Sequence, residues 1–151
     1  VFGGKWYFLY ISYMYKKKHL DLAADLSYSS DKQEKIGAVI TDKKKIVSWG
    51  VSLKKTHPIQ GKYNKIRFAD NKGEPGIDIA HVHAEIDALN RAKRKNLKGH
   101  TMYIYRESMT GDLRMCRPCK GCMQALIDRG IRKIVYTTPN GVAVEKITNF
   151  D

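Results

Sequence analysis

Cysteine is scarce in this chain, and its distribution is unusual. Of 151 residues only three are cysteines, and all three lie in the stretch MCRPCKGC at residues 115–122. Cysteines confined to one short stretch cannot form a disulfide framework that links distant parts of a fold. Such clusters in intracellular proteins more often bind a metal or take part in chemistry, so we expect a reducing, cytoplasmic setting.

Long apolar runs are also missing from the sequence. The strongest candidate, residues 6–15, is aromatic and apolar over only about ten residues, which is too short to span a bilayer. It also lacks the small-residue cleavage site of a signal peptide. We therefore expect no membrane partner, and we interpret this stretch as the start of a helix or as a packing contact, within one molecule or in a homo-oligomer.

Acidic residues are few compared with basic ones. The chain has 28 Lys and Arg against 15 Asp and Glu, which gives a formal net charge of +13. This balance suits a phosphate-bearing partner, either a nucleotide or a nucleic acid. A lysine-rich surface that serves only solubility explains the charge equally well, so charge alone does not decide between them.

The length and the composition fit one domain with a single core. We expect an aromatic and basic extension over residues 1–18 and one domain over residues 19–151. Apolar spacing predicts a helix from Leu20 onward. Strands are predicted at 35–41 and 45–52, joined by a tight turn. The polar segment 53–76 has no such pattern, which is typical of functional or partly disordered loops.

The second half of the chain alternates helices and strands. The patterns predict helices at 79–95 and 119–129, and they predict strands at 101–106, 131–138 and 142–148. The order β-β-α-β-α-β-β follows a leading helix. It predicts an α/β fold, in which helices pack on the faces of one sheet.

Two short motifs carry the residue types of a metal site. HVHAEID at 81–87 and RPCKGC at 117–122 each lie at a predicted helix start. Cys119 and Cys122 are one helical turn apart, so both sulfurs can point the same way, and a helix N-terminus favours the metal-binding thiolate. With His83 as a third ligand, the set suits zinc. It leaves one tetrahedral position open for water, as in catalytic zinc sites.

Glu85 supplies the acid–base chemistry that such a site needs. Two thiolates and a neutral imidazole make the zinc complex formally neutral, so its water is less acidic and a nearby proton acceptor becomes important. Glu85 can take that proton and return it to a ring nitrogen or a leaving amine. Because residues i and i+2 do not share a helix face, His83 must lie at the first turn for both side chains to reach the metal.

Two other residues compete for the metal. Cys116 would complete a closed, structural set of three cysteines and one histidine. It precedes Pro118 in the loop, however, and a closed site leaves Glu85 without a role, so we expect Cys116 to have a packing role. His81 fits a hydrogen-bonding or substrate-pocket histidine better than a metal ligand.

H-A-E at 83–85 followed by P-C-x-x-C at 118–122 is a specific pair of motifs. It resembles the signature of the zinc-dependent nucleobase deaminases. The chain from Leu20 onward is similar to the cytidine and deoxycytidylate deaminase superfamily, and it resembles phage and bacterial deoxycytidylate-type members. The resemblance implies a three-layer α-β-α fold around a five-stranded mixed sheet, with helices on both faces.

The resemblance also implies roles for individual residues. His83, Cys119 and Cys122 would bind zinc, and Glu85 would shuttle the proton. The implied reaction is hydrolytic deamination, in which zinc hydroxide attacks C4 of cytosine and ammonia leaves. The backbone around Ala84 and the amide of Cys119 would touch the base and the hydroxide.

Two positions depart from the family pattern. Many relatives have Glu-Pro-Cys where this chain has Arg117-Pro118-Cys119. The family's second strand often ends in Gly-x-Asn, and that Asn contacts the sugar. The corresponding residues here are Gly50-Val51-Ser52, so we expect Ser52 to make a weaker version of the contact.

The polar segment upstream of the motifs bears on the substrate. Its basic and aromatic residues are expected near the site, with His81 as a pocket residue: Lys54, Lys55, His57, Lys62, Tyr63, Lys65 and Arg67. In a first hypothesis they clamp the 5′-phosphate of a cytosine-containing nucleotide such as dCMP. In a second they guide single-stranded DNA or RNA whose flipped base, cytosine or else adenine, enters the pocket, with Tyr63 or Phe68 stacking.

Two plainer interpretations stand beside these hypotheses. The segment can be solvated and have no part in substrate binding. The chain can also be a non-catalytic, zinc-stabilised module that binds nucleic acid, in which case replacing Glu85 would leave its function intact.

Overall fold

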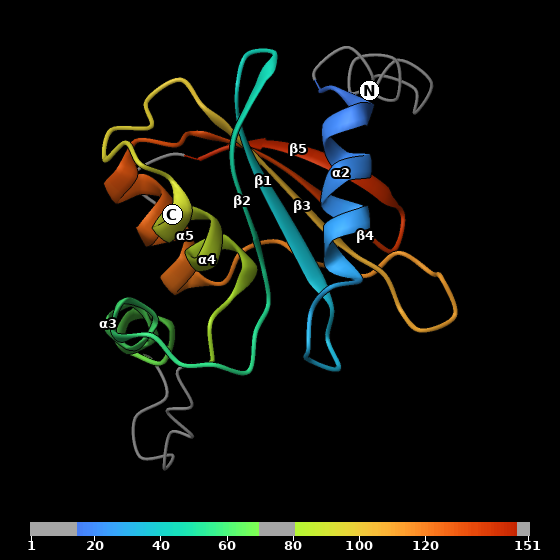
Figure 1. Cartoon of the computed structure of the whole chain (residues 1–151), viewed down its shortest axis with the longest axis horizontal. Coiled ribbons are helices and arrows are strands. Elements are labelled where there is room, and N and C mark those ends of the chain that lie inside the picture. The colour runs from blue at the N-terminus through green and yellow to red at the C-terminus, as the bar shows by residue number, and fades with distance from the viewer. Residues whose placement is uncertain (1–14, 70–80, 148–151) are drawn as a thin grey trace, which may run out of the picture.

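The computed structural model describes residues 15–69 and 81–147, and they form a five-stranded mixed sheet with helices on both faces (Figure 1). The strand order is β2-β1-β3-β4-β5; β3 and β4 run parallel and the other neighbours antiparallel. The strands are β1 (Ile36–Asp42), β2 (Lys45–Val51), β3 (Thr101–Arg106), β4 (Lys133–Thr138) and β5 (Gly141–Lys146). The α/β fold predicted from the sequence is confirmed.

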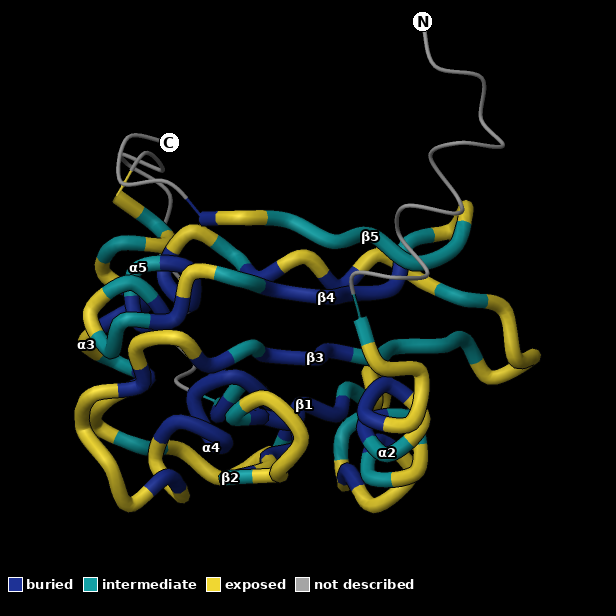
Figure 2. Tube along the Cα trace, turned by 90° about the horizontal axis from the view of Figure 1, so that it is seen from above, coloured by how far each residue is buried: buried dark blue, intermediate teal, exposed yellow. Residues whose placement is uncertain are grey.

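The helices are divided between the two faces of the sheet. On one face lies α2 (Lys17–Ser27), where Leu20 and Ala23 pack against Val39, Tyr103 and Val135. On the other face lie α4 (Ala84–Arg91) and α5 (Lys120–Arg129), which share the larger apolar core with β1, β3 and β4. Figure 2 shows the central strands as the most buried part of the trace, whereas the outer strand β5 is only half-buried.

The sheet has two functionally different ends because the connections alternate between them. At one end β1 begins, β2 and β3 finish, and both α4 and α5 start. At the opposite end α2 starts, β1 turns into β2, and α4 leads into β3 (Figure 1). The two motifs with metal-ligand residues therefore come to the same end of the sheet, although 29 residues lie between positions 87 and 117 in the chain.

The described part of the polar segment, residues 53–69, is more regular than its composition suggested. Helix α3 (Pro58–Arg67) lies within it, so the prediction of an irregular loop is wrong for these helical residues. His57 caps this helix by accepting a hydrogen bond from the N–H of Ile59, and Pro58 occupies the first turn, as Pro often does. The buried side of the helix carries Gln60 and Asn64, whose polarity hid the helical pattern from a search for apolar periodicity.

The helix predicted at 79–95 is shorter than expected. It comprises only Ala84–Arg91, and residues 81–83 are not helical. Backbone hydrogen bonds fix this approach to the helix: Val82 N–H donates to the carbonyl of Lys55, and Leu53 N–H donates to the carbonyl of Val82, each at 3.0 Å. Because Val82 pairs with the chain that follows β2, it is not part of the helix. Helix α4 therefore begins only at Ala84, with His83 as its N-cap residue.

The aromatic stretch at 6–15 lies almost wholly outside the described residues, and so does the expected oligomer contact there. Among the described helices, none has both the length and the apolar composition needed to cross a bilayer.

Candidate metal centre and active site

The three predicted metal ligands lie at the starts of two neighbouring helices. His83 is the N-cap residue of α4, and Cys119 is the N-cap residue of α5, each with an extended backbone. Cys122 lies in the first turn of α5 and is fully buried. The position of His83 satisfies the geometric condition stated above, because it precedes the helix that carries Glu85.

The potential ligand atoms of these residues converge. His83 Nδ1 lies 3.2 Å from Cys122 Sγ and 3.8 Å from Cys119 Sγ. One ligand atom from each of the three side chains lies within 4.8 Å of the other two. Tetrahedral zinc with Zn–S of about 2.3 Å and Zn–N of about 2.0 Å separates sulfur from nitrogen by about 3.5 Å. The three side chains therefore fit zinc in both donor type and spacing.

The two thiols of α5 have opposite acidities. The hydrogen bond from Cys122 is the largest effect that lowers the pKa of Cys119 to about 4, and His83 contributes in the same direction. The pKa of Cys122 is raised, first by that same hydrogen bond and then by burial. The pair thus holds one thiolate readily at neutral pH, and a metal ion would compete with the second proton.

Glu85 is buried directly beside this group, at the second position of α4. Only 5% of the residue is exposed, and burial raises the pKa of its carboxyl group; His83 opposes the shift and Cys119 adds to it. A hydrogen bond also links Glu85 to Cys122. A carboxylate in this position can exchange protons with groups bound at the three ligand atoms.

Cys116 lies apart from the other two cysteines. It is buried in the core, with Sγ 3.1 Å from Thr137 Oγ1 and 3.4 Å from the carbonyl oxygen of Ile104. Burial raises the pKa of its thiol to about 12, so it stays protonated. The group of possible metal ligands among the described residues does not include it. The expected packing role of Cys116 agrees with this position.

The side chain that supports His83 was not anticipated from the sequence. Gln60 of α3 is almost fully buried, and its Oε1 accepts a hydrogen bond of 2.9 Å from the backbone N–H of His83. Its Nε2 donates to Oδ1 of Asn64 at 2.9 Å, which fixes the orientation of the amide. As the N-cap residue, His83 keeps an N–H outside the helix, and Gln60 satisfies it.

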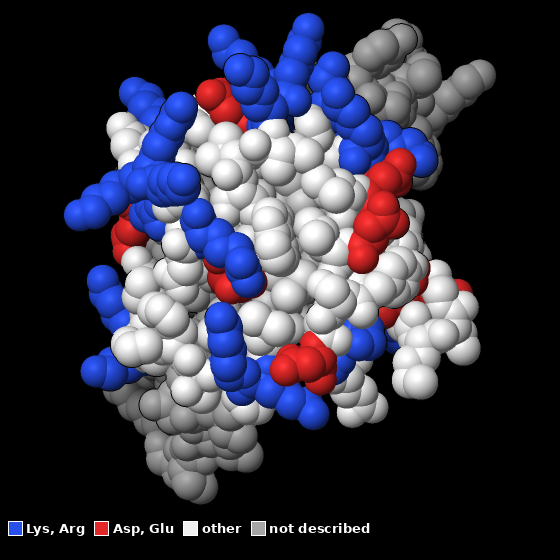
Figure 3. Space-filling model, viewed as in Figure 1, with Lys and Arg blue, Asp and Glu red and all other residues white. Residues whose placement is uncertain are grey.

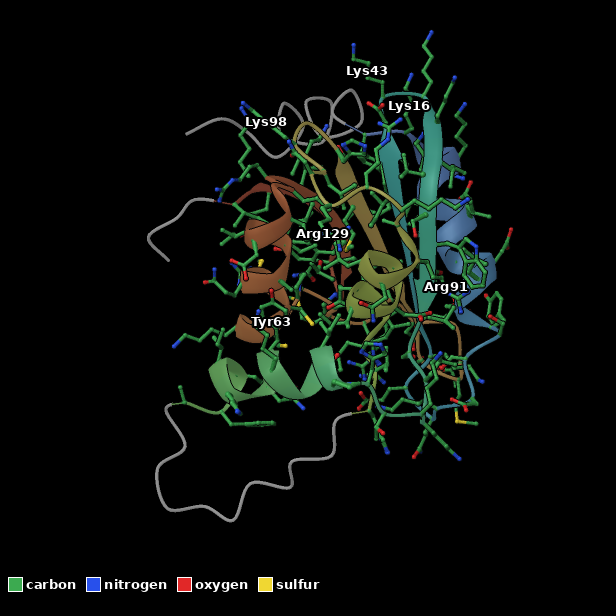
Figure 4. The ribbon with its side chains drawn as sticks, turned by 60° about the vertical axis from the view of Figure 1, so that its left-hand side comes forward. Lys16, Lys43, Tyr63, Arg91, Lys98 and Arg129 are labelled. Atoms are coloured by element: carbon green, nitrogen blue, oxygen red, sulfur yellow. The ribbon has the colours of Figure 1, made fainter. Side chains whose placement is uncertain are left out.

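Close packing of α3 against α5 explains the glycine in RPCKGC. A Cβ atom at Gly121 would overlap the backbone carbonyl oxygen of Tyr63. Tyr63 itself is buried between the two helices, and its hydroxyl donates to Asp128 at 2.6 Å (Figure 4). Tyr63, expected as a substrate contact, therefore joins α3 to α5 and offers no free ring for base stacking.

Arg67 is an expected substrate residue whose side chain contacts one of the ligand side chains. Its Nη1 is 3.0 Å from Nε2 of His83, on the side of the imidazole that faces away from the thiols. Lys54 and Lys55 are exposed on the segment that pairs with residues 81–82, and His57 is used as the cap of α3.

Three further candidates occupy the surroundings of the ligands. Ala84 is the first residue of α4 and is fully buried. His81 lies two residues before His83. It is half-buried, and its backbone forms a β-bridge with Thr56. The hydroxyl of Ser52 is committed to the start of β1, because it accepts from Ile36 N–H at 3.0 Å and donates to the carbonyl of Glu34 at 2.8 Å.

Arg117, which replaces the glutamate of many relatives, has a structural partner. Its guanidinium forms two hydrogen bonds with Glu145 of β5, at 2.9 and 2.7 Å. This ion pair lowers the pKa of the Glu145 carboxyl group, and the hydroxyl of Tyr136 donates to the same carboxylate. The pair ties the loop before α5 to the outer strand of the sheet.

Two deaminases of known structure have a similar fold. A cytidine deaminase from Burkholderia pseudomallei aligns with a TM-score of 0.60 at 17% identity, over 87% of this chain and 92% of its own. The dCMP deaminase from the cyanophage S-TIM5, in apo form, aligns with a TM-score of 0.52 at 18% identity, over 80% and 79%. The same enzyme in complex with dCMP and dUMP gives 0.52 at 17% identity, over 80% and 78%.

Sequence comparison points to the same family. No curated protein matches the chain by sequence. The family described as cytidine and deoxycytidylate deaminase zinc-binding region matches residues 13–138, which include both motifs and all three converging ligand side chains. The chain therefore belongs to the zinc-dependent cytidine and deoxycytidylate deaminase family, and it is an enzyme that deaminates cytosine.

Proposed function

We propose that the chain converts dCMP to dUMP, with His83, Cys119 and Cys122 as the zinc ligands and Glu85 as the proton shuttle. The observation that carries the proposal is the position of a buried carboxylate next to three converging ligand atoms. A closed structural zinc site does not need such a carboxylate, whereas hydrolytic deamination does. We also propose a cytoplasmic setting, which suits three free cysteines.

The chemistry divides between the metal and the protein. When bound, zinc supplies a Lewis acid that makes the attacking water more acidic. Glu85 accepts a proton from this water and delivers it to N3 of cytosine. As the water oxygen adds to C4, the amino group at C4 becomes the leaving group. Glu85 then passes a second proton to that group, which leaves as ammonia and yields uracil.

Basic residues on α3 support a phosphorylated substrate. Arg67 lies beside His83, and Lys62 and Lys65 are exposed on the same helix. We propose that these cations hold the 5′-phosphate, with Lys54, Lys55 and His57 as outer contacts and His81 in the pocket. The cyanophage enzyme of similar fold, determined with dCMP and dUMP, is consistent with a monophosphate substrate.

Ser52 and Tyr63 have a different place in this proposal. Both side chains are already hydrogen-bonded within the protein, so we assign them to the support of the pocket walls. Ala84 would contribute its backbone at the start of α4.

Parallel assays with several substrates test the proposal. The zinc-loaded protein is incubated with dCMP, dCTP, cytidine, and a cytosine-containing single strand, and uracil formation is measured by mass spectrometry. We expect dCMP to be converted with the highest kcat/KM. Conversion of the strand alone would contradict the nucleotide hypothesis and favour the polynucleotide hypothesis. An adenine-containing strand in the same series tests whether adenine, the other base considered for a polynucleotide substrate, is deaminated.

A variant of Arg67 distinguishes the two substrate classes further. Arg67→Gln is expected to raise KM for dCMP and to leave KM for cytidine nearly unchanged, because cytidine has no phosphate. Equal effects on both substrates would show that Arg67 acts on the ligand histidine and not on phosphate.

A further inference from the structure

Basic side chains gather at the end of the sheet opposite to the metal ligands. Three chain segments meet there: residues 16–18 at the start of α2, 43–45 at the turn between β1 and β2, and 93–98 between α4 and β3. Every Lys and Arg in these segments is exposed. We call them together the distal basic surface; Figure 3 shows such side chains along the upper edge of the molecule.

Contacts among the described residues hold the three segments in one place. Thr41 pairs with Thr101 across β1 and β3, just before the turn and just after the α4–β3 connection. Arg94 lies 4.0 Å from Asp42, which joins the second segment to the third. Figure 4 shows Lys16, Lys43 and Lys98 at this end, whereas Tyr63 marks the end with the ligands.

A cavity joins the first segment to the second. It has a volume of about 450 Å³ and is lined by Lys18, His19, Leu22, Lys44, Lys45 and Ile46. Three of these six side chains are lysines, and none is acidic. A concave site with several ammonium groups and no carboxylate in its lining is suited to an anion such as a phosphate group.

Acidic residues neutralise only part of the distal basic surface. Two of its cations, Lys17 and Arg94, lie within ion-pair distance of Asp21 and Asp42, and its other lysines form no ion pair among the described residues. The buried imidazole of His19 responds to the excess charge: burial lowers its pKa, and Lys18 and Lys16 lower it further. The positive potential at this end is therefore available to a partner from outside.

We propose that the distal basic surface binds the phosphate backbone of a nucleic-acid strand, away from the metal ligands. One mononucleotide phosphate would use only the cavity beside α2. Three segments with exposed cations present positive charge over a wider area, which suits a chain of phosphates. This surface holds a strand independently of catalysis, so the proposal does not depend on which cytosine compound is the substrate.

Binding of a strand without cytosine tests the proposal. A fluorescein-labelled thymidine oligomer of about 20 nucleotides is longer than the stretch that one ssDNA-binding fold usually occupies. It cannot be deaminated, because thymine has no exocyclic amino group. Fluorescence anisotropy measures its Kd for the zinc-loaded protein over a range of salt concentrations. The distal variant is Lys18→Gln/Lys44→Gln/Lys95→Gln, with one change in each segment. The matched control is Lys54→Gln/Lys55→Gln/Lys62→Gln, which has the same net charge but is altered at the ligand end.

The two variants give opposite expectations. The distal variant should bind the oligomer about tenfold or more weakly, and the slope of log K against log salt should fall by about 2, since three phosphate contacts are lost. Its turnover of dCMP should equal that of the wild type. The control should retain the affinity for the oligomer and show an increased KM for dCMP.

Three results would overturn the proposal. Equal losses of affinity in both variants would show that net charge alone matters. A larger loss in the control would place the strand at the ligand end. Failure of the wild type to bind the oligomer at low salt, with binding to vesicles of anionic phospholipid instead, would make the partner a membrane surface. Circular dichroism of both variants establishes that the fold is unchanged.

Discussion

The two ends of the sheet differ in burial and in the kind of side chain that they carry. At the ligand end, the functional groups are buried or half-buried and are fixed by helix starts: His83 and Cys119 are N-cap residues, and Glu85 is 5% exposed. At the other end, turns carry exposed lysines with few acidic neighbours. The exposed positive charge of this chain and the groups suited to catalysis therefore lie in different parts of the molecule. The residues that point to catalysis occupy a few buried or half-buried positions.

The largest effect is expected from the buried carboxylate. Glu85→Gln removes the proton shuttle but keeps the size of the side chain, so kcat should fall by about 10³-fold or more while zinc remains bound. Steady-state assays with dCMP and metal analysis of the same sample measure both properties. The control is Glu34→Gln, an exposed carboxylate 3.5 Å from Arg106. Wild-type activity of Glu85→Gln would disprove the role of Glu85.

Replacement of single cysteines sharpens the difference between ligand and core positions. Cys119→Ala and Cys122→Ala should each lose zinc and activity, because two ligands remain from three. Cys116→Ala should keep a full equivalent of zinc and lose only about 1 kcal/mol of unfolding free energy, as a small core truncation does. Mass spectrometry of the metal content decides the matter. Zinc loss in Cys116→Ala would establish the closed site of three cysteines and one histidine.

Gln60 tests whether the ligand end depends on a residue that never touches the metal. Gln60→Ala leaves the N–H of His83 without its partner, so zinc affinity should fall by about 10- to 100-fold. Competition with a chromogenic chelator measures this affinity. Gln124→Ala is the matched control. In the described structure the side-chain amide of Gln124 forms one hydrogen bond, which it donates to Asp128. Equal affinities in the two variants would limit Gln60 to a packing role.

The contact between α3 and α5 should respond to a single methyl group. In Gly121→Ala the new Cβ meets the carbonyl of Tyr63, so the helices must separate at a cost of about 1–3 kcal/mol. Gly99→Ala has open space around the new atom and pays only for a left-handed backbone, about 1 kcal/mol. Urea unfolding compares the two. A smaller loss for Gly121→Ala than for Gly99→Ala would contradict the close packing.

The smallest effect concerns the ion pair of Arg117 with Glu145. Because Arg117 lowers the pKa of Glu145, the pair stabilises the fold above the carboxyl's unfolded pKa, and the stabilisation is lost as the pH falls through the lower folded value. Both side chains are partly exposed, so the effect should be about 0.2–1 kcal/mol. Unfolding of Glu145→Gln should approach that of the wild type below about pH 4. A difference that widens on acidification would contradict this sign.

Sequence patterns predicted the sheet and the ligand group because both depend on local spacing. Short apolar runs on either side of a tight turn located β1 and β2, and the one-turn separation of Cys119 from Cys122 anticipated their common direction. The pairing of the two motifs across the fold was inferred from their metal-ligand residue types and from the family resemblance, not from local spacing. Fold and ligand group therefore agree with the structure in their main features.

The support of the ligand group could not be predicted in this way. Helix α3 buries Gln60 and Asn64, and polar residues on a buried face defeat a search for apolar periodicity. The capping residue His57 and the following Pro58 were the available signals, since Pro favours the first turn of a helix. The start of α4 was misplaced for a related reason: hydrogen bonds from Val82 and Leu53 form between segments, and no local pattern reports them.

The convergence of His83 with Cys119 and Cys122 has a consequence for the unfolded chain. These residues are 36 and 39 positions apart in sequence, so an ion held between them closes a loop that contains β3 and the long connection after it. Closing a loop of this length restricts the unfolded chain by about 4 kcal/mol in the polymer treatment used for covalent cross-links. The ion would then be a reversible cross-link between the two segments that carry the ligands. A chelator should therefore lower the melting temperature of the protein as well as stop its reaction.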